Sequence, residues 1–389
     1  MTFTVIEPGS VLGVLGGGQL GAMFTMAAQR MGFQVAVWDP DADAPAHRLA
    51  QRSFSTSFSD QRALGQFLDL VSAVTYEWEN VPVSLCGTLE ATKPVRPSSA
   101  VLHTIQDRLE QKGFLAARGF PVVPFLPLTK PEQLPAVVGK IGYPALVKTA
   151  TTGYDGKGQW RITCKTDAEQ VERTLYDSAR PGIRWIVEGL VTFDRELSIL
   201  IVRGMDGQTG VYPVAENEHE AGILRTTLVP ARVPSEIAAR AAVLARQVVE
   251  ALQGVGVFCL ELFYLSTGEL LINEIAPRPH NSGHYTLDAC SVSQFEQQVR
   301  ALCGLPLGEI RLLKAAAMVN LLGNDATTIS EPSCEALLDT PGTFLHLYGK
   351  RTMRSRRKMG HVTFVADSLN LAQERAQQLR RRLASGLRT

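Results

Sequence analysis

The chain has 389 residues, 45% of them hydrophobic and 20% charged, with a formal net charge of +1. This length predicts two or three domains, and the composition is typical of a globular protein with a substantial core. The near-neutral charge argues against nucleic acid or a membrane as partner. The N-terminus has no signal-peptide pattern, no apolar run approaches the ~20 residues that span a bilayer, and the six cysteines are scattered. We therefore expect a cytoplasmic protein without a disulfide or zinc framework.

Residues 11–100 alternate apolar runs with amphipathic helical patterns, which predicts a doubly wound parallel sheet. From about residue 140, strands joined by hairpin turns become more frequent. The fold class expected is mixed α/β and α+β. Three domains are predicted: residues 1–103, a central domain over 104–305 with a smaller subdomain at about 127–190, and a small β-rich domain over 306–389.

A glycine motif, Gly16-x-Gly18-x-x-Gly21, follows the first predicted strand and opens a helix, and Asp39 ends the next strand. Spacing and context match the dinucleotide fingerprint, in which glycines let the backbone approach a pyrophosphate. A tight structural turn, or a site for another anion at the helix N-terminus, fits equally well. The motif alone leaves both interpretations open.

A second glycine-rich loop, residues 153–158, follows Lys148 at the end of a strand. Its three glycines allow the backbone to fold over an anion, and the lysine adds a positive charge suited to phosphate. The alternative is a plain hairpin with solvated charges. Loop and lysine together favour a nucleotide-phosphate site.

An acidic pair is predicted where two apolar strands flank Ser266-Thr267-Gly268. If the turn is centred between Thr267 and Gly268, Glu261 lies opposite Glu274, with Cβ atoms about 5 Å apart. Two carboxylates so close repel each other, and a divalent cation such as Mg²⁺, with Asn273 alongside, would relieve the repulsion. The alternative is a pair turned toward water at a sheet edge.

Two further segments carry candidate binding residues. The loop 275–284 contains Arg278, His280 and Asn281 among rigid turn residues, and it could hold a small oxyanion or simply be a capped turn. The segment 350–358 is dense in positive charge. It could bind a substrate phosphate, form a solvated turn or contact nucleic acid, and the lack of interleaved aromatic residues disfavours the last.

Six strings together resemble one family, the 5-(carboxyamino)imidazole ribonucleotide synthases of the ATP-grasp superfamily. They are GVLGGGQLG at 13–21, YEWENV at 76–81, GYDGKGQ at 153–159, GILRTT at 222–227, NEIAPRPHNSGH at 273–284 and RKMGH at 357–361. The resemblance covers about residues 11–365. It implies a pre-ATP-grasp domain, an ATP-grasp domain whose lid is the smaller subdomain, and a C-terminal domain. It also implies that ATP and bicarbonate carboxylate the exocyclic amine of aminoimidazole ribonucleotide through carboxyphosphate, and that the protein is a homodimer.

The resemblance also implies residue roles. ATP would be bound by Arg108, Lys148, Gly153, Tyr154, Asp155, Gly156, Lys157, Gly158, Gln159, Glu188, Gly189, Leu190, Val191, Glu196, His219, Asn273 and Glu274, with Glu188 and Val191 at the adenine. Magnesium would be held by Glu261 and Glu274. Bicarbonate or carboxyphosphate would be held by the catalytic residues Arg278, His280 and Asn281. The imidazole nucleotide would be bound by Glu77, Tyr154, Asp155 and Lys157, and its phosphate by Lys350, Arg357 and Lys358. Lys350 would also be a catalytic residue.

One departure concerns the lid, where Lys157 stands in place of the arginine usual in the family. Lysine keeps the charge but loses the bidentate geometry, so contact with a substrate phosphate could be looser there. Two alternatives remain: a different ATP-grasp ligase, resembling formate-dependent glycinamide ribonucleotide transformylase or biotin carboxylase, and an NAD-dependent oxidoreductase. The oxidoreductase would leave residues 148–158 and 261–284 unexplained.

Overall fold

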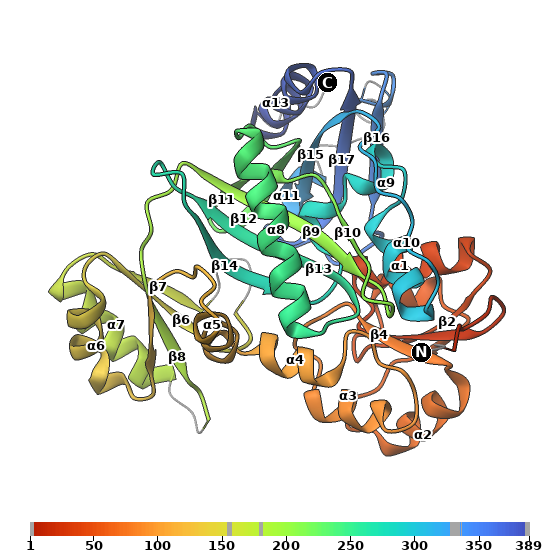
Figure 1. Ribbon diagram of the computed structural model, residues 1–389, viewed down its shortest axis with the longest axis horizontal. Coiled ribbons are helices and arrows are strands. Elements are labelled where there is room, and N and C mark those ends of the chain that lie inside the picture. Colours follow the sequence, from red (N-terminus) through yellow and green to blue (C-terminus); the bar gives the residue numbers. More distant parts are fainter. Residues whose placement is uncertain (1–3, 154–157, 179–181, 327–334, 336, 386–389) are drawn as a thin grey trace.

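The computed structural model describes residues 4–153, 158–178, 182–326, 335 and 337–385 (Figure 1). The strands in these ranges form three sheets. The lid subdomain and the N-terminal domain project from different sides of the largest sheet (Figure 1). Among the described helices, none is both long enough and apolar enough to cross a membrane.

The N-terminal domain is a four-stranded parallel sheet in the order β3-β2-β1-β4. Its strands are β1 (Val11–Leu15), β2 (Gln34–Trp38), β3 (Arg52–Phe54) and β4 (Ala73–Tyr76), and its helices are α1 (Gln19–Arg30), η1 (Pro45–Arg48), α2 (Gln61–Leu70), α3 (Val83–Glu90) and α4 (Ser99–Gln106). Strands β1, β2 and β4 are almost wholly buried and mostly apolar because both faces of the sheet are covered there, whereas β3 is exposed at Arg52 and Ser53. Trp38, Phe54 and Phe67 pack on one another in the core below α2. The predicted doubly wound sheet is therefore confirmed.

The lid subdomain is a four-stranded antiparallel sheet in the order β5-β8-β6-β7. It consists of β5 (Phe125–Leu128), η2 (Pro131–Gln133), α6 (Leu134–Ile141), β6 (Ala145–Thr149), β7 (Gln159–Ile162), α7 (Lys165–Ser178) and β8 (Trp185–Gly189). Both helices pack on the sheet through a small apolar core of their own. Helix α5 (Arg108–Ala117) leads into this subdomain from the N-terminal domain.

The third sheet has nine strands, in the order β14-β13-β9-β11-β12-β15-β17-β16, with β10 beside β9. The strands are β9 (Arg195–Arg203), β10 (Thr209–Val211), β11 (Ala215–Glu220), β12 (Ile223–Val229), β13 (Gly256–Tyr264), β14 (Leu270–Ala276), β15 (Ala315–Leu322), β16 (Thr343–Leu347) and β17 (Lys358–Ala366). Its helices are α8 (Ser235–Leu252), η3 (Asn281–Gly283), α9 (Thr286–Ala289), α10 (Gln294–Cys303), α11 (Gly323–Ala326) and α13 (Leu369–Ser385). Since β15 pairs with β12, the C-terminal strands extend the central sheet and do not form a sheet of their own. The domain boundaries at 103 and 305 remain predictions.

Helix α8 shows why these residues form a buried helix. Its apolar residues recur at helical spacing, and the stripe Ile237, Ala241, Leu244, Val248 and Leu252 is buried against β9 and β13. Gln253 ends the helix in the left-handed region. The helix thereby covers one face of the sheet and leaves the strand ends free to line a cavity.

Candidate active site

A cavity of about 900 Å³ is lined by residues of the N-terminal domain, the lid and the large sheet. The predicted site residues along its wall are Glu77, Arg108, Lys148, Gly153, Gly158, Gln159, Leu190, Glu196, His219, Glu261, Asn273, Glu274, Arg278, His280, Asn281, Lys350, Arg357 and Lys358. Glu188, Gly189 and Val191 are not in this lining. Tyr154, Asp155, Gly156 and Lys157 lie outside the described residues. Sequence positions from 77 to 358 thus converge on one cavity.

The N-terminal glycine motif is filled by a side chain of the protein itself. The main-chain N–H groups of Gly18 and Gly21 donate to the two carboxylate oxygens of Glu77, over 2.6 and 3.1 Å. Gly17 donates to Asp39 over 2.6 Å. A Cβ atom at Gly18 would lie 2.7 Å from the Glu77 carboxylate.

These contacts explain the glycines without a dinucleotide. The anion position at the N-terminus of α1 is occupied by the Glu77 carboxylate, and helix N-termini favour such a charge. Asp39, which would bind a ribose in a dinucleotide site, instead accepts a hydrogen bond from the main-chain N–H of Gly17 in the glycine turn. The NAD interpretation is therefore not supported, and the motif holds Glu77 at the edge of the cavity. Burial raises the pKa of Glu77.

The predicted acidic pair is confirmed. Glu261 on β13 pairs directly with Glu274 on β14, and both line the cavity. The predicted turn centre was wrong, because Tyr264 pairs with Leu270, which places the centre on Thr267. A β-bulge adds one residue to β14 before Glu274 and restores the predicted pairing.

The electrostatics of this pair are those of two crowded acids. Burial and the neighbouring Glu274 carboxylate raise the pKa of Glu261. His280 Nε2 lies 3.2 Å from Glu261, and Arg108 Nη2 lies 3.6 Å from Glu274. Asn273 adds an amide beside them in the same wall. This set of oxygen donors suits a hard divalent cation.

The lysine of the lid strand is held by a buried carboxylate. Lys148 Nζ lies 2.7 Å from Glu188 Oε2, and Lys112 Nζ of α5 lies 3.1 Å from Glu188 Oε1. Burial acts to raise the pKa of Glu188, but the two ammonium groups outweigh it and lower the pKa to about 2. The side chain of Glu188 is only 3% exposed. Its carboxylate is turned to the two lysines, because an isolated buried charge is costly. The contact of Glu188 with an adenine base stays a prediction, and it would have to use the main chain.

The loop after β14 presents Arg278, His280 and Asn281 to the cavity. The Arg278 guanidinium pairs with Glu79, which follows the end of β4. His280 Nδ1 lies 2.9 Å from the Ser282 hydroxyl, and burial, together with the nearby Arg278 charge, holds the pKa of His280 well below its usual value. The buried Asn281 amide has no hydrogen-bond partner within the described part of the chain. An unpaired buried amide on a cavity wall is what a polar ligand would satisfy.

The basic segment reaches across to the N-terminal domain. Lys350 Nζ donates to Gln19 Oε1 over 2.7 Å and to the Lys358 carbonyl over 2.8 Å. Arg351 pairs with Asp43 over 2.9 Å. Charges that the sequence shows only as a basic run are thus fixed beside the glycine turn. Lys350, Arg357 and Lys358 line the cavity, whereas the Arg351 side chain is 69% exposed.

Glu196 and His219 form a pair on neighbouring strands of the cavity wall. Burial acts to lower the pKa of His219, while the hydrogen bond to Glu196 raises it, and the net direction is upward. Near them Phe193 and Phe263 stack with ring centroids 4.6 Å apart. Sequence reasoning missed both phenylalanines, because their contact joins a loop to a strand far along the chain.

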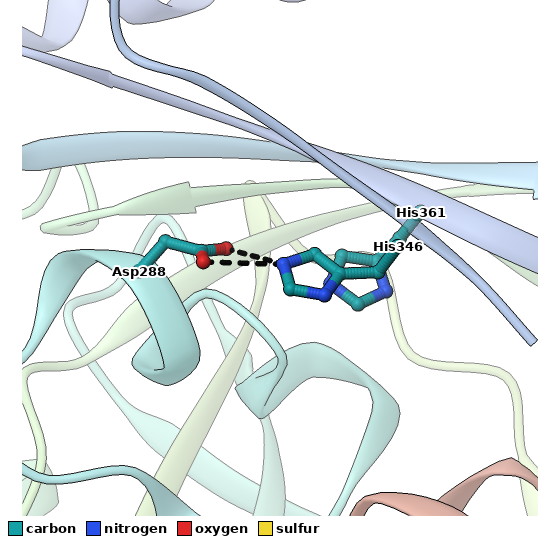
Figure 2. A group of neighbouring side chains, drawn as sticks. All are labelled: Asp288, His346 and His361. Carbon is teal, nitrogen blue, oxygen red and sulfur yellow. Dashed lines mark hydrogen bonds and ion pairs between the residues drawn. The ribbon is translucent and has the colours of Figure 1, made fainter.

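A cluster of histidines also escaped prediction. His346 Nε2 lies 2.9 and 3.1 Å from the Asp288 carboxylate oxygens, and the His346 and His361 rings stack with centroids 4.5 Å apart (Figure 2). The two rings overlap in the view of Figure 2, and the angle between their planes is 14°. A metal binds a histidine nitrogen in the plane of its ring, and one ion cannot lie in two stacked planes. As arranged, the cluster supports strands β16 and β17 and does not present a metal site.

Three family profiles match the chain: the ribonucleotide synthetase preATP-grasp domain over residues 10–106, the ATP-grasp domain over 113–295, and the phosphoribosylaminoimidazole carboxylase C-terminal domain over 316–375. The N5-carboxyaminoimidazole ribonucleotide synthase of Bacillus subtilis is 40% identical over 365 residues, 94% of each chain.

Solved structures agree with these matches. The ADP complex of purK, an N5-carboxyaminoimidazole ribonucleotide synthetase, superposes with a TM-score of 0.92 at 39% identity, covering 97% of this chain and 98% of that one. The Aspergillus clavatus N5-carboxyaminoimidazole synthase in complex with ADP and 5-aminoimidazole ribonucleotide gives a TM-score of 0.87 at 32% identity, covering 97% and 99%. Together with the cavity and its paired glutamates, these matches show that the chain belongs to the N5-carboxyaminoimidazole ribonucleotide synthase family of ATP-grasp ligases.

Proposed function

We propose that the protein uses ATP and bicarbonate to carboxylate the exocyclic amine of 5-aminoimidazole ribonucleotide, with release of ADP and phosphate. The observation that carries the proposal is the wall where the Glu261–Glu274 pair lies beside Arg278, His280 and Asn281. It places cation ligands next to groups that can hold a small oxyanion. The relatives crystallised with ADP and with the imidazole nucleotide support both ligand classes.

The nucleotide phosphates would lie against Arg108 and Lys148, under the loop that includes Gly153 and Gly158. Glu261 and Glu274 would hold Mg²⁺ with Asn273 alongside. The ion would neutralise two carboxylates, of which Glu261 has its pKa raised by burial and by the neighbouring Glu274. When bound, the ion would neutralise charge on the phosphoryl group being transferred. The ribose hydroxyls would meet Glu196, with His219 as its partner. Main-chain groups of 188–191 would meet the adenine, since the Glu188 carboxylate is committed elsewhere.

Bicarbonate would be held by Arg278, His280 and Asn281 while its oxygen attacks the γ-phosphorus. ADP leaves, and carboxyphosphate forms. The Asn281 amide would gain hydrogen bonds that no described residue provides. His280, with its lowered pKa, would be neutral and could accept or donate a hydrogen bond without adding charge. The protein contributes position and charge neutralisation, and no covalent nucleophile is needed.

The imidazole nucleotide would lie toward the N-terminal domain. Glu77 would face its base, and Lys350, Arg357 and Lys358 would bind its phosphate. The amine nitrogen attacks the carboxyl carbon of carboxyphosphate, the bond from that carbon to the phosphate oxygen breaks, and the phosphate leaves with the amine proton. Alternatively, carboxyphosphate first splits into carbon dioxide and phosphate, the nitrogen attacks the carbon dioxide, and the phosphate takes the proton. Contacts from Tyr154, Asp155 and Lys157 stay predictions, as do the homodimer, the cytoplasmic location and the absence of a nucleic-acid partner.

The test measures ADP release with ATP, magnesium and bicarbonate, with and without aminoimidazole ribonucleotide. We expect strong stimulation by the imidazole nucleotide, abolished in Glu274→Gln. Glu269→Gln, an exposed glutamate of the same hairpin, is the matched control and should behave as the unmodified protein. Nucleotide binding without any stimulation would show that the acceptor is a different amine.

A further inference from the structure

Two ion pairs that share Glu188 link three charged side chains beside the part of the cavity where we propose that phosphate binds. Lys112 Nζ lies 3.1 Å from one oxygen of Glu188, and Lys148 Nζ lies 2.7 Å from the other. The side chains of Lys112, Glu188 and Lys148 are 2%, 3% and 14% exposed. Of these three residues, only Lys148 lines the cavity.

This group of three side chains carries two positive charges and one negative charge. If Glu188 had Lys148 as its only partner, the pair would be neutral, and Lys148 would offer little attraction to an anion. Lys112 supplies the second counter-charge, so the group as a whole keeps a net charge of +1. Because Lys112 and Glu188 are buried, water screens this charge weakly, and its field extends toward the cavity through Lys148.

We propose that Lys112 is a positioning residue for nucleotide binding: by sharing the Glu188 carboxylate, it leaves Lys148 with charge available to a phosphate. Lys112 itself touches no ligand. The inference rests on the proposed function only in that the phosphate bound at Lys148 belongs to a nucleotide.

The geometry makes this arrangement specific. Lys112 comes from α5, which begins with Arg108, another residue of the cavity wall. Lys148 and Glu188 come from the paired strands β6 and β8 of the lid subdomain. Lys112 therefore joins the lid sheet to the helix that carries the next phosphate-binding candidate. Burial lowers the pKa of Lys112, and the Glu188 carboxylate opposes that effect only in part, by favouring the charged form.

The experiment compares ADP affinity, by calorimetry at fixed magnesium and salt, in three proteins: unmodified, Lys112→Met, and the double variant Lys112→Met/Glu188→Gln. The single variant reduces the net charge of the group to zero, and we expect ADP to bind roughly tenfold or more weakly. The double variant restores a net charge of +1 at Lys148, and we expect most of the affinity to return. Lys140→Met, an exposed lysine at the end of α6, is the control and should bind normally.

Two results would overturn the proposal. One is a Lys112→Met protein that binds ADP as tightly as the unmodified protein, which would make Lys112 a purely structural residue. The other is a double variant that binds as weakly as the single one, which would rule out charge as the mechanism. Lys112→Gln, which keeps a polar group at the site, is made in parallel in case the methionine variant does not fold. The readout needs no imidazole nucleotide, so a failure of the proposed carboxylation would leave this test unaffected.

Discussion

The Glu77 carboxylate lies against the main-chain N–H group of Gly18, at the position where a helix N-terminus would otherwise hold a ligand's anion. The glycine is needed for this contact and not for its backbone angles, since φ at Gly18 is −67°. Glu77 is thereby fixed in the wall of the cavity where we propose that the reaction takes place.

Gly18→Ala tests this contact. The added Cβ would lie 2.7 Å from the Glu77 carboxylate, so the side chain must move while the backbone can remain in place. We expect the KM for the imidazole nucleotide to rise about tenfold or more, with little change in the KM for ATP. Steady-state kinetics with each substrate varied in turn would measure the difference.

Gly65→Ala is the matched control. Gly65 lies in the exposed part of α2, and a Cβ there meets nothing within 4 Å. The substitution should stabilise the helix slightly, by about 0.5–1 kcal/mol, and leave both KM values unchanged. Equal kinetic effects from the two alanines would show that Gly18 acts through general stability.

Glu261→Gln is expected to separate stability from metal binding. The pKa of Glu261 is raised, so the unmodified protein loses stability as the pH rises through the interval between the usual and the raised value. Glutamine removes that loss, and the ligand-free variant should unfold at a higher temperature at about pH 8 than the unmodified protein. The additional stabilisation by ATP should no longer depend on magnesium. Thermal unfolding with EDTA, magnesium, and magnesium with ATP would measure both effects.

His284→Phe is expected to reduce the sensitivity of the protein to acid. His284 is buried, its two ring nitrogens have no partner within the described part of the chain, and burial holds its pKa well below the usual value. Below its ordinary pKa the unfolded chain binds a proton that the folded protein does not, so stability falls as the pH falls through about 6.5. Phenylalanine removes this contribution.

Urea unfolding at several pH values between about 5 and 8 would give the slope of the unfolding free energy. The variant should be less steep by up to about 1.4 kcal/mol per pH unit, which corresponds to one proton. A slope equal to that of the unmodified protein would mean that His284 is protonated in the folded state.

Arg278→Lys should lower kcat with little effect on ATP affinity. The guanidinium pairs with Glu79 and also donates through Nη1 to the Pro279 carbonyl over 3.0 Å, a geometry that an ammonium group cannot reproduce. We expect a loss of roughly 10²-fold in kcat if the residue stabilises carboxyphosphate. Arg62→Lys, on the exposed face of α2, serves as control. A variant with normal kcat and weaker ATP binding would place Arg278 at the nucleotide instead.

The sequence was most informative where chemistry is local. The pairing of Glu261 with Glu274 follows from an alternating hairpin, and the prediction held although the turn is centred one half-residue away, because the bulge at β14 compensates. The strand-end position of Lys148 was likewise predictable from the loop that follows it. Both depend on residues close together along the chain.

Contacts between distant segments could not be predicted in the same way. Glu77 fills the glycine turn from 59 residues away, and no local pattern distinguishes that arrangement from a dinucleotide site. The ion pair of Glu188 with Lys112 was not foreseen either, because Lys112 lies in a helix of another part of the chain. The stacking of His346 on His361 depends on the register of two strands separated by a basic loop. In each case the deciding partner is brought in by the tertiary fold.

The hydrogen bonds between β12 and β15 also determine how the protein can be divided. A shortened chain ending near residue 305 would lose β15, β16 and β17 and leave the edge of β12 unpaired. Exposed strand edges recruit other strands, so such a fragment would tend to aggregate. We therefore expect the last two predicted domains to unfold as one cooperative unit, because the boundary between them runs through the middle of a sheet. Limited proteolysis should not separate them, and domain exchange among relatives should move them together.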